Sequence, residues 1–142
     1  MQNFLKSVVS ASVLGWCWCA VGCGGGESFG SFPVRGKVLV NGEPAAHVSV
    51  VLHRTDFEAF EKPAGETDEN GEFQLTTRVA NDGAAPGEYL VTLSWHKPLS
   101  TGSDPDYGPE LLPKQFQDPK KSGQKVVIEE RSNELPPFDI KF

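Results

Sequence analysis

The side chains that could perform acid–base or metal chemistry are few and widely separated in this chain. Its three histidines are His47, His53 and His96, and no two of them have the close spacing of a zinc-binding pair. A zinc site needs three or four converging ligands, so the sequence predicts neither a metal site nor a cofactor. We interpret all three as surface or strand-edge histidines, although His53 and His96 could approach each other if their strands are neighbours.

Two other combinations contain the residue types of hydrolytic sites. Ser94 lies two positions before His96, which places both side chains on one face of a strand. A nucleophile needs an adjacent base, but such a pair also occurs often by chance. Glu129 and Glu130 are adjacent and point to opposite faces, unlike the facing carboxylates of a glycosidase. The sequence therefore predicts no catalytic residue and favours a protein that is not an enzyme.

An acidic run from Asp68 to Glu72 has the composition of a calcium-binding loop. The twelfth position counted from Asp68 is Val79, where such a loop needs a bidentate carboxylate. The same residues suit a tight turn, with Asp68 accepting backbone hydrogen bonds and Gly71 in the left-handed region. We therefore expect a turn rather than a calcium site.

The first 22 residues have the three-part shape of a secretory signal. Lys6 and the amino terminus supply weak positive charge, and an uncharged apolar stretch then runs from Ser7 to Gly22. This stretch is about 16 residues long, whereas a membrane-spanning helix needs about 20. We expect residues 1–22 to be a cleaved signal peptide rather than a permanent span.

The end of this stretch, Ala20-Val21-Gly22-Cys23, resembles the lipobox of bacterial lipoproteins. In that family a small residue precedes a cysteine that is lipidated and becomes the mature amino terminus. Cys17 and Cys19 each follow a bulky tryptophan. The resemblance therefore implies lipidation at Cys23, and an ordinary cleaved signal with a coincidental cysteine is the alternative. Gly24 stands where an Asp retains such proteins at the inner membrane, which favours the outer one in a cell with two membranes.

The charge and length of the rest of the chain limit its partners and its organisation. The formal net charge is −6, which disfavours nucleic acid as a partner. Cleavage would leave about 120 residues, the size of one domain. We expect a lipidated flexible tether at 23–32, followed by one domain at 33–142 that has no cysteine pair for a disulfide.

Alternation with a period of two predicts an all-β domain. We expect seven short strands in a β-sandwich, among them 34–40, 46–53, 73–75, 89–96, 125–130 and 138–142. Asn41-Gly42 predicts a hairpin turn after the first of these strands. Five prolines interrupt 97–123, where we expect no more regular structure than one helical turn around Glu110-Leu111-Leu112.

Several motifs together resemble the carboxypeptidase regulatory-like domain, a transthyretin-like and immunoglobulin-like sandwich. The motifs, within residues 33–96, are Val34-Arg35-Gly36-Lys37-Val38, Asn41-Gly42-Glu43-Pro44, Val48-Ser49-Val50, the run 67–73 and Pro86-Gly87-Glu88-Tyr89-Leu90-Val91. The tail looks like small bacterial lipoproteins that carry this domain alone. An enzymatic branch of the transthyretin-like group ends in Tyr-Arg-Gly-Ser, whereas this chain ends in Phe138-Asp139-Ile140-Lys141-Phe142, so no catalytic role carries over.

These observations predict a membrane-anchored, non-enzymatic interaction or structural module of the cell envelope, exposed outside the cytoplasm. Its expected partners are membrane lipid, through Cys23, and an envelope protein or polysaccharide. The alternative is a small-ligand or carbohydrate-binding lipoprotein, with a site between the loop 54–65 and the segment 97–123. The candidate contact surface consists of Phe57, Phe60, Tyr107 and Phe116.

Overall fold

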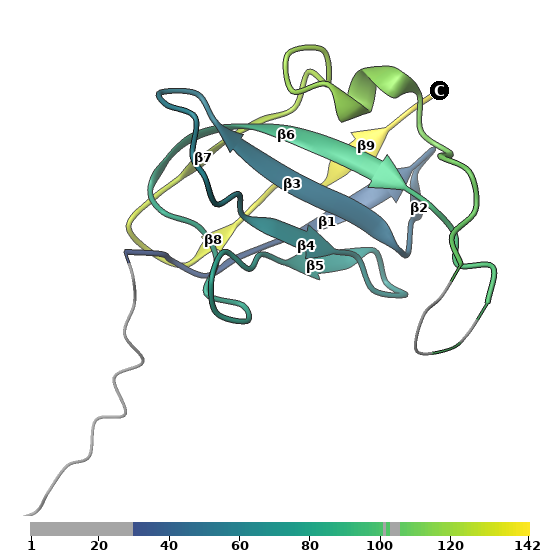
Figure 1. The fold of residues 1–142 in the computed structure, drawn as a ribbon, viewed down its shortest axis with the longest axis horizontal. Coiled ribbons are helices and arrows are strands. Elements are labelled where there is room, and N and C mark those ends of the chain that lie inside the picture. Colours follow the sequence, from purple (N-terminus) through teal and green to yellow (C-terminus); the bar gives the residue numbers. More distant parts are fainter. Residues whose placement is uncertain (1–29, 101, 103–105) are drawn as a thin grey trace, which may run out of the picture.

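A computed structural model describes residues 30–100, 102 and 106–142, which form two packed β-sheets (Figure 1). The strands are β1 Val34–Val40, β2 Glu43–Pro44, β3 Val48–Arg54, β4 Ala64–Glu66, β5 Glu72–Gln74, β6 Gly87–Trp95, β7 Lys125–Ile128, β8 Asn133–Glu134 and β9 Phe138–Ile140. The predicted all-β sandwich is confirmed. The expected count of seven is wrong, because the described residues contain nine strands, and β2, β4 and β8 are too short to show alternation. The predicted signal peptide and Cys23 lie outside the described residues.

The first sheet is built around β1, which pairs with four other strands. β2 and β5 run antiparallel to it, whereas β8 and β9 run parallel to it. The turn predicted at Asn41-Gly42 is confirmed, with φ of 53° and 85° at the two residues. This turn leads into the two-residue β2, and β3 then belongs to the other sheet. The parallel pairs fasten the end of the chain to its first strand.

The second sheet is antiparallel, in the order β4-β3-β6-β7. Its centre is the β3–β6 ladder, in which Val48 pairs with Trp95 at one end and Arg54 pairs with Tyr89 at the other. Six inward-facing side chains of this ladder are buried, namely Val48, Val50, Leu52, Tyr89, Val91 and Leu93, and Trp95 is partly buried against this core. Because the strands are antiparallel, residues just before β3 and just after β6 lie at one end of the ladder. Residues after β3 and before β6 lie at the other end.

The two predicted features around β5 are also confirmed. The Asp68 carboxylate accepts hydrogen bonds from the N–H groups of Asn70 and Glu72 at 2.8 and 3.0 Å, and Gly71 has a φ of 73°. This turn leads into β5, where Phe73 lies in the core and its ring stacks on Phe138 with centroids 6.1 Å apart.

The segment 97–123 is largely irregular, as its prolines predict. The expected helical turn around 110–112 is wrong, and a 3₁₀ helix, η1 (Lys114–Gln117), occurs instead. Phe116 in this turn is only 6% exposed, so burial of its ring accounts for the position of η1. Glu110 instead binds backbone groups through its carboxylate, as described below. Within the described part of the chain, we find no helix with the length and apolar character needed to cross a membrane.

Candidate functional site

The four predicted contact residues do not form one surface. Phe57 and Phe60, in the loop after β3, are exposed, whereas Tyr107 is exposed at the opposite end of the β3–β6 ladder. Phe116 is buried in the core, so its assignment to an exposed contact surface is wrong. The aromatic side chains therefore mark two separate regions of the molecule.

An open surface hollow of about 510 Å³, lined by polar residue types, lies at the end of the ladder where β6 terminates. Its lining residues are His47, Ser49, Glu66, Ser94, His96, Tyr107 and Gly108. Three of them form a row across β4, β3 and β6, because Glu66 pairs with Ser49 and Ser49 pairs with Ser94. Directly opposed residues on neighbouring strands project from the same face of a sheet. We name this region the polar hollow and treat it as the candidate functional site.

The Glu110 carboxylate organises the edge of the polar hollow. One oxygen accepts hydrogen bonds from the N–H groups of Trp95 and Leu112 at 2.8 and 2.9 Å. The other accepts the Ser94 hydroxyl at 2.5 Å and lies 3.3 Å from Nε2 of His96. These contacts add to the backbone hydrogen bond from the N–H of Leu111 to the carbonyl oxygen of Trp95, which also joins the proline-rich segment to the end of β6.

The contacts of Ser94 and His96 do not join the two residues as a nucleophile and its base. The Ser94 hydroxyl donates its hydrogen bond to the Glu110 carboxylate rather than to His96. Nδ1 of His96 lies 2.8 Å from the carbonyl oxygen of Gly108, and its Nε2 lies 3.3 Å from a Glu110 oxygen. A nucleophile needs its base within hydrogen-bond reach, and here the carboxylate takes that place beside the hydroxyl.

Several influences act on the ionisation of Glu110. Burial, the largest of them, raises its pKa, but the hydrogen bonds from Ser94, Leu112 and Trp95 and the nearby His96 together hold its pKa below the ordinary value. Glu110 is therefore a carboxylate at neutral pH, which is the form that accepts all of these hydrogen bonds.

The other two histidines lie at opposite ends of the ladder. His47 joins the polar hollow, with Nδ1 2.9 Å from a carboxylate oxygen of Glu66. His53 lies 2.9 Å from the Thr92 hydroxyl, and burial, followed by the positive charge of Lys62, lowers its pKa. The expected approach of His53 to His96 is wrong: their strands are neighbours but antiparallel, so the two rings lie about 20 Å apart along the ladder.

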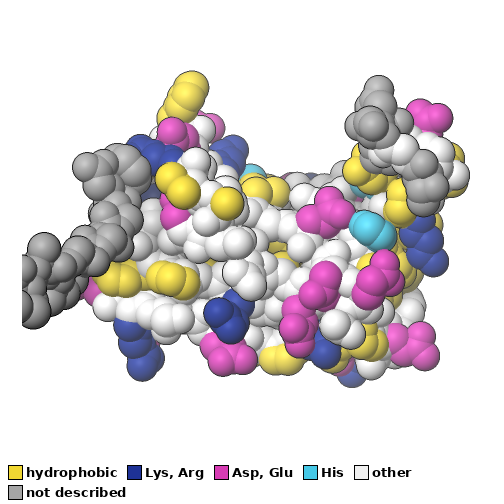
Figure 2. Space-filling view, turned by 90° about the horizontal axis from the view of Figure 1, so that it is seen from below, with side chains coloured by type: hydrophobic (Ala, Val, Ile, Leu, Met, Phe, Trp, Pro, Cys, Tyr) yellow, Lys and Arg dark blue, Asp and Glu magenta, His cyan; other side chains and the backbone are white. Residues whose placement is uncertain are grey.

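Glu66 lines the polar hollow, and the turn that follows β4 carries Asp68 and Glu69. Asp68 and Glu72 line a separate hollow together with Arg35 and Lys37. Figure 2 shows acidic side chains gathered on one half of the face in view, with a histidine among them. Over the described residues, no group of three or more metal-ligating side chains is close enough to hold an ion.

A second region, the aromatic loop (residues 55–62), lies at the other end of the ladder. Arg54 holds its base: Nε and Nη2 donate to the two Asp56 oxygens at 2.8 and 2.9 Å. This hydrogen bonding lowers the pKa of Asp56 to about 2. The guanidinium also lies 4.6 Å from the ring centroid of Phe57 and 5.5 Å from that of Tyr89. These contacts fix the position of the Phe57 ring.

Two hollows flank the aromatic loop. One of about 360 Å³ is lined by residues that include Ser31, Phe57 and Phe60. The other, of about 660 Å³, lies between the loop and residues 118–120. The second is where the sequence predicted a ligand site, between the loop 54–65 and the segment 97–123.

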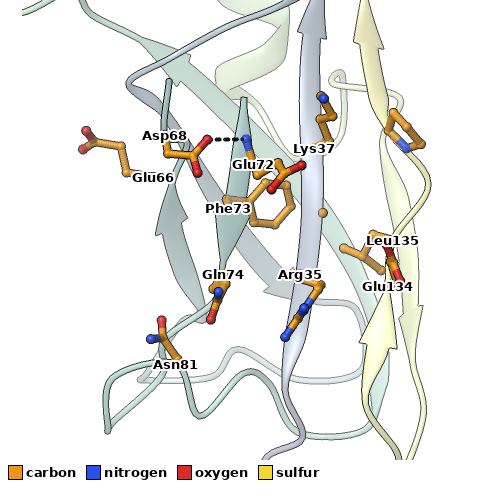
Figure 3. Close-up of a pocket in the computed structure, with 12 residues that line it drawn as sticks. Arg35, Lys37, Glu66, Asp68, Glu72, Phe73, Gln74, Asn81, Glu134 and Leu135 are labelled. Atoms are coloured by element: carbon orange, nitrogen blue, oxygen red, sulfur yellow. Dashed lines mark hydrogen bonds between the residues drawn. The ribbon is translucent and has the colours of Figure 1, made fainter. Parts of the chain in front are cut away.

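A further hollow of about 560 Å³ lies over β1 and β5 (Figure 3). Lys37 faces Glu72 across the two strands, and Arg35 pairs with Gln74 on one side and Glu134 on the other. Opposite charges on facing strands are ordinary stabilising neighbours on an exposed sheet. We therefore interpret this hollow as a solvated face of the first sheet.

Sequence reasoning missed the roles of Glu110, His47 and Arg54. Glu110 meets Ser94 and His96 only because the irregular segment folds back on β6, and no spacing rule encodes that return. Arg54 and Asp56 form a local pair whose spacing gives a weak signal, but its contact with Tyr89 depends on the strand register.

We predict that Glu110→Gln destabilises the fold by about 1–2 kcal/mol at pH 7, because its single amide oxygen cannot accept all three hydrogen bonds. A carboxyl with a lowered folded-state pKa contributes stability above its ordinary pKa, and that stability is lost as the pH falls through the folded value. The deficit of the variant should therefore shrink below about pH 4. Urea unfolding of the variant and of the wild type at pH 7 and below pH 4 measures this difference in the free energy of unfolding.

The matched control for this measurement is Glu130→Gln, at an exposed position. We expect that variant to unfold with the wild-type midpoint at both pH values. Equal stability of Glu110→Gln and wild type at pH 7 would contradict the structural role of Glu110.

Comparison with known proteins identifies no family for this chain. No protein-family model and no curated protein matches it. Among solved structures, a 9R-lipoxygenase from Cyanothece PCC8801 is similar over 95% of this chain, with 11% sequence identity and a TM-score of 0.42. The chain spans 18% of the length of that lipoxygenase. A likeness of this extent carries no conclusion about activity.

Proposed function

We propose that this chain is a lipid-anchored, non-enzymatic β-sandwich module of the cell envelope, which binds an envelope protein or polysaccharide at the polar hollow. The observation that carries the proposal is the commitment of Ser94 and His96 to Glu110 and Gly108. The residues that could form a nucleophile and base serve as structural supports, while Tyr107 beside them is 55% exposed and available for contact.

The place where the chain enters the domain supports this assignment. Ser31 lines a hollow beside Phe57 and Phe60, at the end of the ladder away from the polar hollow. A chain anchored at Cys23 would therefore present the polar hollow on its far side, outside the cytoplasm. The resemblance to the carboxypeptidase regulatory-like domain agrees with a non-catalytic role, and Gly24 favours the outer membrane in a cell with two membranes.

The anchor predicts a specific mature amino terminus. Mass spectrometry of the membrane-bound protein should find a chain that begins at Cys23 and carries the added mass of acyl chains. Cys23→Ser should remove the lipid and release the protein from the membrane fraction, because stable anchoring needs the acyl chains. Cys19→Ser is the matched control and should remain anchored. Detection of a native chain that retains Met1 would refute the anchor.

The interaction site predicts position-dependent cross-linking. A photoreactive phenylalanine analogue at Tyr107 should give a discrete covalent adduct in intact envelopes, because its side chain borders the polar hollow. The control position is Val127 on the edge strand β7, which is 60% exposed and therefore similarly accessible. No adduct at either position, or the same adducts at both, would argue against the polar hollow as the contact site.

A ligand-binding function is the second candidate, and the hollow of about 660 Å³ favours it. Ligand pockets have volumes of about 300–1,000 Å³, with apolar walls and a few polar groups. This hollow combines the Phe57 ring and Leu90 with His53, Lys62 and Lys120. Glu58 and Asp118 also line it, and a sugar or small metabolite with groups of both polarities suits that lining.

Thermal-shift screening against glycans and small metabolites distinguishes the two candidates. A true ligand at about 100 times its dissociation constant stabilises the fold by about 2.7 kcal/mol. We expect Phe57→Ala to abolish the shift and Tyr107→Ala to retain it. The reverse pattern would place a small-ligand site in the polar hollow instead.

A further inference from the structure

The aromatic loop exposes two large apolar side chains at its tip. Phe60 is 103% exposed and Phe57 is 57% exposed. Glu58, an exposed carboxylate, and Ala59 lie between them, and the two rings make up the apolar part of the tip. We propose that this loop inserts into the surface of the lipid bilayer and forms a second attachment that orients the anchored domain. The proposal rests on the proposed anchoring through Cys23.

The position of the loop relative to the anchor is the first argument. Ser31, near the start of the described chain, lines the same hollow as Phe57 and Phe60 (Figure 1 shows the chain entering at this end). Ser31 follows Cys23 by eight positions, which span at most about 26–29 Å when fully extended. The bilayer that holds the acyl chains is therefore within short reach of the aromatic loop.

The charges around the loop are the second argument. The ion pairs at the loop are Arg54–Asp56 and Arg78–Glu61. The other two charged residues, Glu58 and Lys62, have opposite signs. The loop and these partners are thus electrically neutral although the whole chain carries −6, and neutrality suits an apolar insertion among zwitterionic headgroups.

The opposite end of the domain has the contrary character. Glu66 on β4 lines the polar hollow, and Asp68, Glu69 and Glu72 follow it without an intervening cation, so β4 and the turn after it form an acidic surface. Negatively charged headgroups repel such a surface. Both ends of the ladder therefore favour the same orientation, with the aromatic loop toward the membrane and the polar hollow away from it.

The base of the loop is rigid enough to present its aromatic tip. The Arg54 guanidinium lies between the rings of Phe57 and Tyr89, and the Asp56 carboxylate accepts the N–H of Phe57 at 3.1 Å. A pre-positioned ring loses less conformational freedom on insertion than a mobile one. A bilayer is thus the occupant that reach, charge and preorganisation together indicate, rather than a second copy of the chain.

Fluorescence quenching in vesicles tests the orientation. The lipidated mature protein is reconstituted into phosphatidylcholine vesicles with brominated acyl chains, which quench tryptophan on contact. The test variant is Phe60→Trp and the matched control is Tyr107→Trp at the far end. Both variants retain Trp95, and its fluorescence is measured in the wild-type protein and subtracted. We expect the signal of Phe60→Trp to be quenched at least about two-fold more than that of Tyr107→Trp, as a residue seated in the interface would be.

Each other outcome overturns the proposal in a recognisable way. Equal quenching of the two variants, or none, in protein that floats with the vesicles would refute loop insertion and leave the anchor intact. Quenching that falls as protein density rises would indicate that a second copy of the chain covers the loop. Protein that does not float with the vesicles would refute the anchor, and the inference with it.

Discussion

The antiparallel pairing of β3 with β6 is the constraint on which the rest of this structure depends. Six inward side chains of this ladder are buried, and each contributes about 1.5–3 kcal/mol relative to exposure. A slip of one residue would turn all of them toward solvent, so burial fixes the register. The register in turn fixes which polar and aromatic residues meet at each end of the domain.

At the polar hollow, the folded structure determines which partners the residues of a sequence pattern contact. Ser94 and His96 have the types and spacing of a reactive pair, and the strand does place them on one face. Backbone hydrogen bonds from Gly108 to Lys97 and from Leu111 to Trp95 hold the segment after β6 against the end of that strand. Glu110 adds side-chain contacts at the same place, and in doing so it contacts both groups of the pair.

Alternation along the chain predicted β1, β3 and β6 because each has one buried face and seven or more residues. Turn chemistry predicted Asn41-Gly42 and Asp68 because both act locally. The strands β2, β4 and β8 were not predictable, since their pairing depends on neighbours distant in sequence. Phe116 was misassigned because an aromatic residue in an irregular segment has no periodicity to indicate which way it points.

The same limit applies to the candidate surfaces, and it explains their asymmetry. Phe57, Phe60 and Tyr107 looked equivalent in sequence, since each is an aromatic residue in a polar loop. The ladder separates Tyr107 from the two phenylalanines by its full length. Phe57 and Phe60 lie near paired charges and the start of the domain, whereas Tyr107 lies near Glu66 and two histidines. A domain with net charge −6 would gain no orientation from charge spread evenly over its surface. Charges of both signs balance at the aromatic loop, whereas β4 and the turn after it carry carboxylates without a cation between them, so a nearby negative surface would turn the domain one way.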